Sequence, residues 1–110
     1  MEFIEKLDGA VIVSDAEGNI TYLNETAIRN FEKEGGKDLI GTNMFKCHNE
    51  TSRQKLREMI EGREKNVYTI EKQGKKKLIY QTPWFNEGEF KGFVELSLEI
   101  PPEMPHFIRK

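Results

Sequence analysis

The chain has 110 residues, of which 33% are charged, and its formal net charge is -2. This length suits a single small domain with one core. The slightly acidic balance argues against a nucleic-acid-binding protein, which would normally carry a basic excess to meet phosphates. The basic run at residues 75–77 is too short to alter this, and we interpret it as the solvated end of a hairpin.

Hydropathy and cysteine content indicate the cellular compartment of the protein. No apolar run approaches the ~20 residues that cross a bilayer, so no membrane association is expected. The N-terminus starts with acidic side chains and lacks a basic leader, so it is not a signal peptide. The single cysteine, Cys47, cannot form an internal disulfide, which fits a reducing compartment. These features predict a cytoplasmic protein.

The first predicted elements are a short helix and a hairpin. Residues 2–7 place Phe3, Ile4 and Leu7 on one helical face. Residues 10–14 are apolar and β-branched, and residues 19–23 form the returning strand. Between the two strands, Asp15 and Gly18 supply turn chemistry.

Two further helices are predicted in the middle of the chain. Asn24 is the expected N-cap of a helix over residues 25–36, which ends at a Gly-Gly pair. Its apolar stripe is Ala27, Ile28 and Phe31. After an irregular stretch, Thr51 and Gln54 have capping-box spacing. The helix they open is expected to end at Gly62 and to carry Leu56, Met59 and Ile60 on one face.

The last third of the chain predicts three strands, over residues 66–73, 75–86 and 90–100, joined by tight turns as antiparallel neighbours. Pro83 predicts a bulge or a sheet edge. The final strand predicts one packed and one more polar face, because Val94, Leu96, Leu98 and Ile100 alternate with Glu95, Ser97 and Glu99. Two strands, several helices and three strands indicate an α+β fold with one antiparallel sheet and helices over one face.

These residues, in this order, resemble a PAS domain. PAS domains typically show Leu-Asp, an apolar strand, Asp-x-x-Gly-x-Ile and an Asn shortly before a helix. This chain has Leu7-Asp8, the strand at 10–13, Asp15, Gly18, Ile20 and Asn24, and later Leu39-Ile40-Gly41. The resemblance implies a five-stranded antiparallel sheet in the order 2-1-5-4-3, with short helices over one face and a pocket beneath them. It also implies a single PAS domain over residues 1–100, followed by a proline-containing C-terminal tail over residues 101–110.

PAS domains are sensor and interaction modules, and catalysis is not a family trait, so the resemblance implies that this chain is not an enzyme. A small enzyme that acts in the pocket is the weaker alternative. We expect a signalling module that mediates protein–protein interaction and binds a small apolar ligand in its pocket. The usual Asp-Ile-Thr ending and coiled-coil linker are replaced by Glu99-Ile100-Pro101 and further prolines, which forbid a continuous helix. We therefore expect a stand-alone module that acts through itself or through a separate signalling protein.

No cofactor is required by the sequence. Flavin photoreceptor PAS domains carry Gly-x-Asn-Cys-Arg-Phe; Gly41, Asn43 and Phe45 resemble this motif, but Met44 stands at the cysteine position. A flavin photoadduct is therefore not expected. Haem-binding PAS domains usually carry the iron ligand on the helix that follows, which has no histidine here. His48 precedes that helix, and a haem-based redox or gas sensor using His48 is the alternative function.

The adjacent Cys47 and His48 first suggest metal or nucleophile chemistry. One Cys and two distant His cannot supply a closed four-ligand zinc site, so no metal site is predicted. We interpret Cys47 as a small buried residue, with a reactive thiol as the alternative. His48 is either a loop residue bonded to nearby backbone or a pocket residue.

The candidate pocket residues come from the middle helix region and from two strands. Aromatic side chains in a small domain are first explained by core packing. If a ligand is bound, the polar-tipped aromatics on neighbouring strands are its expected lining. The candidate set is Phe45, His48, Met59, Tyr68, Tyr80 and Trp84.

A homodimer is predicted from the first strand. Residues 10–13 are apolar on both faces, and a strand points alternate residues to opposite sides. Helices cover one face, so the other needs cover. The N-terminal segment is too short to be a stable helix alone. The predicted interface is Phe3, Ile4, Leu7, Val11 and Val13, and the alternative is a monomer whose N-terminal segment folds back on its own sheet.

Overall fold

The computed structural model describes residues 2–44, 54, 57–58 and 61–110. Helix α1 spans Glu2–Glu5 and helix α2 spans Glu25–Asn30, with 3-10 turns η1 at Glu32–Glu34 and η2 at Gly36–Leu39. The strands are β1 Ala10–Asp15, β2 Ile20–Leu23, β3 Asn66–Lys72, β4 Lys75–Asn86 and β5 Glu89–Ile100.

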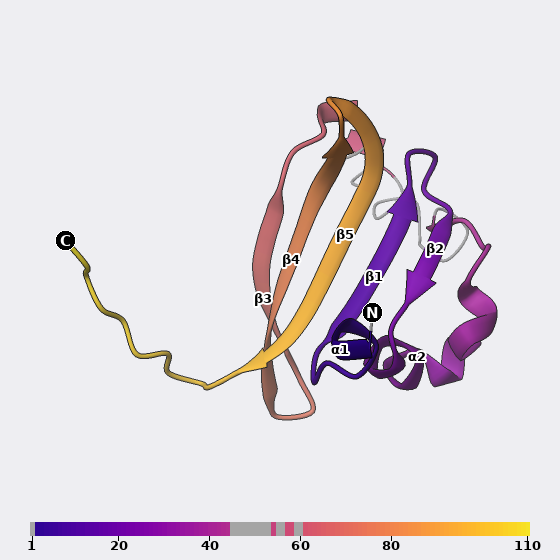
Figure 1. Ribbon diagram of the computed structural model, residues 1–110. Helices are drawn as coiled ribbons and strands as arrows, with labels where there is room; N and C mark the ends of the chain where they lie inside the picture. Colours follow the sequence, from indigo (N-terminus) through magenta and orange to yellow (C-terminus); the bar gives the residue numbers. More distant parts are fainter. Residues whose placement is uncertain (1, 45–53, 55–56, 59–60) are drawn as a thin grey trace.

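The five strands form one antiparallel sheet in the order β2-β1-β5-β4-β3 (Figure 1). The predicted α+β class and strand order are thus confirmed. Ala27 of α2 packs with Ala10, Ile12 and Leu23, so α2 covers the β1–β2 part of one face. We call this side of the sheet the helix-facing side and the opposite side the outer face.

The helix predicted over residues 25–36 is shorter than expected. It ends at Asn30 and continues as η1 and η2, which are separated by Gly35 at a φ of 124°. This tighter winding lets Phe31 and Leu39 both pack against the core. Farther along the chain, the described residues 54, 57–58 and 61–62 have helical backbone. Thr51, Leu56, Met59 and Ile60, on which the predicted cap and apolar face depend, lie outside the described residues.

Two tight turns set the register of the long C-terminal strands. Gln73-Gly74 and Glu87-Gly88 each have positive φ at both central residues, as type I′ hairpin turns require. Pro83 lies beyond Gln81, the last β4 residue paired with β3, and just before a register shift at Trp84/Phe85. The expectation of an edge is confirmed, since no described β3 residue pairs with Pro83 and a missing N–H is tolerated there, whereas the register shift falls one residue later.

The turn between β1 and β2 is built on Asp15. Its Oδ1 accepts hydrogen bonds from the Glu17 and Asn19 amides, both at 2.9 Å. Desolvation is the largest influence on the pKa of Asp15 and raises it, but the bonds donated by Asn19, Glu17 and Gly18 together hold that pKa below its ordinary value. The Asp-x-x-Gly spacing therefore reflects a carboxylate that organises a turn, not a catalytic acid.

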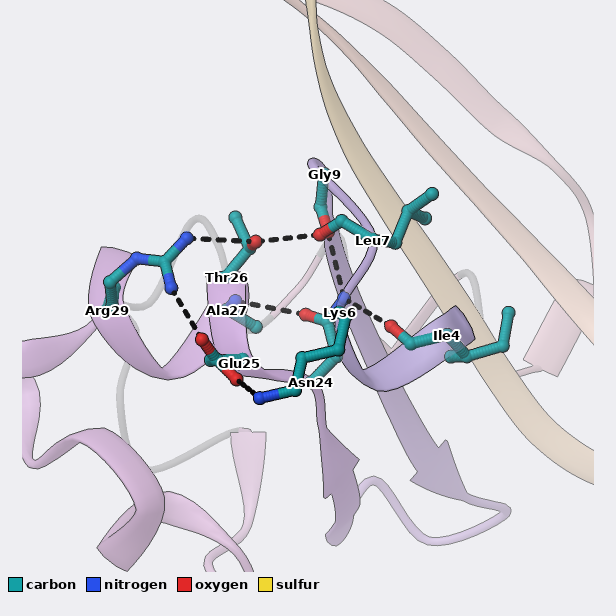
Figure 2. Close-up of polar contacts among 9 residues, drawn as sticks. All are labelled: Ile4, Lys6, Leu7, Gly9, Asn24, Glu25, Thr26, Ala27 and Arg29. Carbon is teal, nitrogen blue, oxygen red and sulfur yellow. Dashed lines mark hydrogen bonds and ion pairs between the residues drawn. The ribbon is translucent and has the colours of Figure 1, made fainter. Parts of the chain in front are cut away.

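Asn24 joins α1, β1 and α2 at one buried point (Figure 2). Its Oδ1 accepts from the Val11 amide at 2.9 Å and from the Ala27 amide at 3.0 Å. Its Nδ2 donates to the Ile4 and Gly9 carbonyls, both at 2.9 Å. The predicted N-cap is confirmed, and the same side chain also fixes the N-terminal segment.

Further contacts hold α1 against β2 and α2. The Tyr22 hydroxyl donates to Glu5 at 2.6 Å, and the Thr26 hydroxyl donates to the Leu7 carbonyl at 2.8 Å. Lys6 forms an ion pair with Glu25 at 2.7 Å, which Arg29 also contacts. The exposed ion pairs stabilise little by themselves. The buried Asn24 and the two hydroxyl contacts therefore provide most of the anchoring.

Replacing Asn24 by Ala is expected to lower the free energy of unfolding by about 3 kcal/mol, because it strips partners from buried amides and carbonyls. Asn24→Asp should cost less, since it keeps the acceptor for Val11 and Ala27. The matched control is Asn30→Ala at the exposed end of the same helix, with an expected change within about 0.5 kcal/mol. Urea titration measures all three variants. Equal costs for Asn24→Ala and Asn30→Ala would contradict the anchoring role.

The hydrogen bond to Glu5, followed by desolvation, raises the pKa of Tyr22 to about 12 from an ordinary value of 10.0. Because the folded-state pKa lies above the unfolded one, the contact stabilises the fold fully below pH 10 and is lost as the pH rises toward 12. An NMR titration of the Tyr22 ring should show this value, and Glu5→Ala should return it toward 10 whereas Glu2→Ala should not. A wild-type Tyr22 that titrates at its ordinary pKa would exclude the contact.

Candidate ligand-binding side of the sheet

A row of side chains crosses the helix-facing side of all five strands. The pairings Leu23–Ile12, Ile12–Glu95, Glu95–Gln81 and Gln81–Asn66 align in register. Paired residues in antiparallel strands share a face. The row is therefore apolar on β2 and β1 and polar on β5, β4 and β3. We call Glu95, Gln81 and Asn66 the polar row.

Hydrogen bonds orient the polar row. The Asn66 side-chain amide donates to Gln81 Oε1 at 3.0 Å, and Gln81 Nε2 donates to Glu95 Oε1 in a short contact. All three residues are partly buried. A carboxylate and two carboxamides thus hold fixed orientations on a side of the sheet that small domains normally fill with apolar groups.

Ser14 adds a buried polar group next to this row. Its side chain follows Ala10 and Ile12 on the helix-facing side of β1 and pairs across with Phe93 of β5, two residues from Glu95. Ser14 is only 3% exposed, and among the residues that the structure describes its Oγ has no hydrogen-bond partner. An unsatisfied buried hydroxyl costs free energy and is uncommon in native proteins, so it calls for an explanation.

Tyr68 lies on the same side of β3, because it pairs with the buried Ile79. Tyr68 is 42% exposed, and its partial desolvation, followed by the Glu95 carboxylate, raises the pKa of its phenol above the ordinary value. The phenol therefore stays neutral and can donate a hydrogen bond near neutral pH.

The structure separates the aromatic residues expected to line a pocket. Tyr80 pairs with Val67 and Leu96, which places it on the outer face, opposite Tyr68. Trp84 lies near the end of β4 and is 38% exposed. Of the two tyrosines, only Tyr68 therefore lies on the same side of the sheet as the polar row. Phe45, His48 and Met59 lie outside the described residues, as does Cys47.

Sequence reasoning missed Ser14 and the polar row. The alternation of β5 was predicted correctly, but the side that meets the helices is the opposite of the one implied. Phe93, Glu95 and Ser97 face the helices, because they pair with Ser14, Ile12 and Ala10. The apolar residues Val94, Leu96 and Leu98 face outward. The available signal was Ser14 itself, which is the polar residue in the inward series Ala10, Ile12 and Ser14 of β1.

The outer face carries an apolar row. Val11, Leu96, Tyr80 and Val67 align across β1, β5, β4 and β3. Of the residues predicted for a dimer interface, Phe3 is 69% and Leu7 40% exposed, whereas Val11 is buried at 5%. Ile4 and Val13 are intermediate. Of the predicted interface residues, Phe3 and Leu7 are therefore accessible to a partner, whereas Val11 is packed within the chain.

Two searches concern metals and membranes. In the part of the chain that the structure describes, no group of three or more His, Cys, Asp and Glu side chains could hold a metal ion. Across the same residues, no helix has the length and apolar character needed to cross a bilayer.

Comparison with solved structures places the fold among known proteins. The C-terminal domain of a Streptococcus mutans protein aligns with a TM-score of 0.76 at 17% identity, covering 92% of this chain and 82% of that one. The Aer2 receptor from Vibrio cholerae, described as a dual PAS-heme oxygen sensor, aligns with a TM-score of 0.66 at 20% identity, covering 84% and 95%. VqmA bound to DPO aligns with a TM-score of 0.65 at 17% identity, covering 90% and 56%; a second VqmA structure is from Vibrio cholerae. At these identities the similarity shows the fold alone.

Comparison at the level of sequence identifies the family. No curated protein sequence matches the chain. A family model described as the PAS fold matches residues 2–80, which is well over half of the chain. The match includes the Asp15 turn, the Asn24 cap and the strands β1 to β3. The chain therefore belongs to the PAS family.

Proposed function

We propose that this PAS domain is a sensory module that binds a small ligand on the helix-facing side of its sheet and pairs with a second copy of itself. PAS domains are typically sensory modules rather than enzymes. The observation that carries the ligand proposal is the unpartnered Ser14 hydroxyl beside the polar row. The proposed role is binding rather than catalysis, in the cytoplasm.

The chemistry of these side chains favours a ligand with both apolar and hydrogen-bonding groups. Phe93 and Ile79 are buried and supply an apolar floor. The Ser14 hydroxyl can donate to an acceptor on the ligand, and the neutral Tyr68 phenol can donate a second bond. A purely apolar ligand, as expected from the sequence, would leave the Ser14 hydroxyl unsatisfied. VqmA, part of which has the same fold, is described as bound to DPO, and this supports a ligand-binding role.

The ligand proposal predicts opposite effects of one substitution on stability and on binding. Ser14→Ala removes an unsatisfied buried hydroxyl, so in ligand-free protein it should raise the free energy of unfolding by about 1 kcal/mol. The same change should weaken retention of the small molecule released from freshly purified wild-type protein and identified by mass spectrometry.

The control is Ser97→Ala, on the same side of the sheet but two pairs away. It should leave both the free energy of unfolding and the retained molecule nearly unchanged. If Ser14→Ala destabilises ligand-free protein, the hydroxyl has a partner within the fold and the central observation is lost. If neither variant affects a co-purified molecule, that molecule binds elsewhere.

Haem-based sensing through His48 is the second candidate, supported by the Aer2 neighbour that is described as a haem sensor. Haem iron is usually held by an axial His or Cys and in some proteins by Met or Tyr. No described His or Cys lies on the helix-facing side, although Tyr68 and Met44 do. The helix-facing side supplies oxygen and carboxamide groups instead, and His48 lies outside the described residues. The visible spectrum of freshly purified protein separates the candidates, because a Soret band that His48→Ala abolishes would favour haem.

The homodimer proposal is supported by the outer face. Apolar side chains align across four strands there: Val11 is buried within the chain, Leu96 and Tyr80 are half-buried, and Val67 at the edge is 49% exposed. Large exposed apolar surfaces commonly mark interaction sites. A second copy presents the same surface and can bury it by two-fold symmetry. A separate signalling protein is the alternative occupant, and sedimentation equilibrium at micromolar concentration distinguishes the 12.8 kDa monomer from a dimer.

A further inference from the structure

The C-terminal tail, residues 101–110, extends from the end of β5 away from the sheet (Figure 1). All ten residues are exposed, and no regular secondary structure forms in them. Three of the exposed side chains are large and apolar: Met104 at 55%, Phe107 at 68% and Ile108 at 82%. Such a concentration of exposed apolar groups on one short segment is typical of a segment that binds a surface.

Prolines keep this tail extended. Pro101, Pro102 and Pro105 have fixed φ, and each also restricts the residue before it to extended conformations. At about 3.1 Å per residue, residues 101–105 span at most about 15 Å, because the backbone bends at residues 102–103. This stiff stretch holds Phe107 and Ile108 away from the point where β5 ends.

The N-terminal segment of the same chain lies close to that point. A side-chain carbon added at Gly9 would lie 2.5 Å from a Leu98 side-chain atom and 3.9 Å from a Leu7 side-chain atom. Leu7 therefore lies near the C-terminal end of β5. The stiff stretch therefore carries the apolar end of the tail away from its own α1. A second copy can receive it without reversing the chain.

The N-terminal segment offers a complementary surface. Phe3 and Leu7 are four residues apart and both exposed, and we call them the α1 patch. Exposed acidic residues, Glu2 and Asp8, flank the patch. Residues 1–44 carry nine acidic and four basic side chains, whereas the tail ends in Arg109 and Lys110. The two basic residues at the end of the tail are thus opposite in sign to the acidic excess of the N-terminal segment.

We propose that the tail of each chain docks on the α1 patch of a second copy, with Phe107 and Ile108 against Phe3 and Leu7. The exchange is reciprocal, so a two-fold dimer contains two identical contacts. Arg109 and Lys110 lie beside Glu2 and Asp8 of the other copy. This proposal rests on the homodimer proposed above and adds the segment that holds the two copies together.

Complementation between two defective variants tests the exchange. Phe107→Ser with Ile108→Ser removes the tail contact, and Phe3→Ser removes the receiving patch. Each variant alone lacks both contacts, and its dimer dissociation constant should rise at least about tenfold. A mixture of the two keeps one intact contact per heterodimer, so heterodimers should form in preference to either homodimer. Sedimentation equilibrium and native mass spectrometry measure the two effects.

The control is Ile40→Ser, an apolar residue that is 44% exposed and belongs to neither surface. It should dimerise like the wild type. A tail variant that dimerises like the wild type would overturn the exchange and leave the homodimer standing. A mixture that dimerises no better than its components would also overturn it, because the tail would then act within its own chain. A monomeric wild type would remove both proposals.

Discussion

The arrangement of this domain depends on one buried side chain, Asn24. With no exposed surface, its carboxamide must satisfy two donors and two acceptors within the protein, and it does so with four backbone groups from three segments. Each of these hydrogen bonds can form only when the other segments are also in place, so the four bonds form cooperatively. The N-cap of α2, the start of β1 and the position of α1 are consequently set together. The same hydrogen-bond network also positions the exposed α1 patch.

The sheet gives its two sides opposite chemistry. Ser14, Glu95 and Gln81 bring polar groups toward the helices, whereas Val11, Leu96 and Tyr80 bring apolar groups to the outer face. β5 contributes to both sides at adjacent residues, Glu95 and Leu96. In the proposed function, a ligand that contacts β5 on one side would act on a strand that also forms the partner surface on the other. A single strand thus links the proposed sensing and pairing surfaces.

Local chemistry made much of the fold predictable. Asp15 and Gly18 define a turn by their own hydrogen bonds and backbone freedom, and Asn24 precedes a helix that needs a cap. The two glycine-containing turns fixed the register of β3, β4 and β5. The sheet edge predicted at Pro83 was correct, because the missing N–H donor of proline leaves few other positions in a strand.

The rest depended on contacts between distant segments. The alternation of β5 shows that Glu95 and Leu96 face opposite sides, but only pairing with Ile12 and Val11 decides which side meets the helices. The same pairing rule separates Tyr68 from Tyr80. The reach of Asn24 back to Ile4, Gly9 and Val11 has no local signature, because an N-cap needs only the Ala27 amide. The unpartnered state of Ser14 likewise follows from its surroundings.

Hydrogen exchange at the Val11 amide tests the central claim, that Asn24 holds the N-terminal half together. This amide donates to the Asn24 side chain, so its protection reports directly on that contact. We predict that in the wild type it exchanges only through global unfolding. In Asn24→Ala it should exchange far faster, while amides of the β4–β5 hairpin keep their relative protection. A wild-type Val11 amide that exchanges as fast as exposed surface amides would contradict the account.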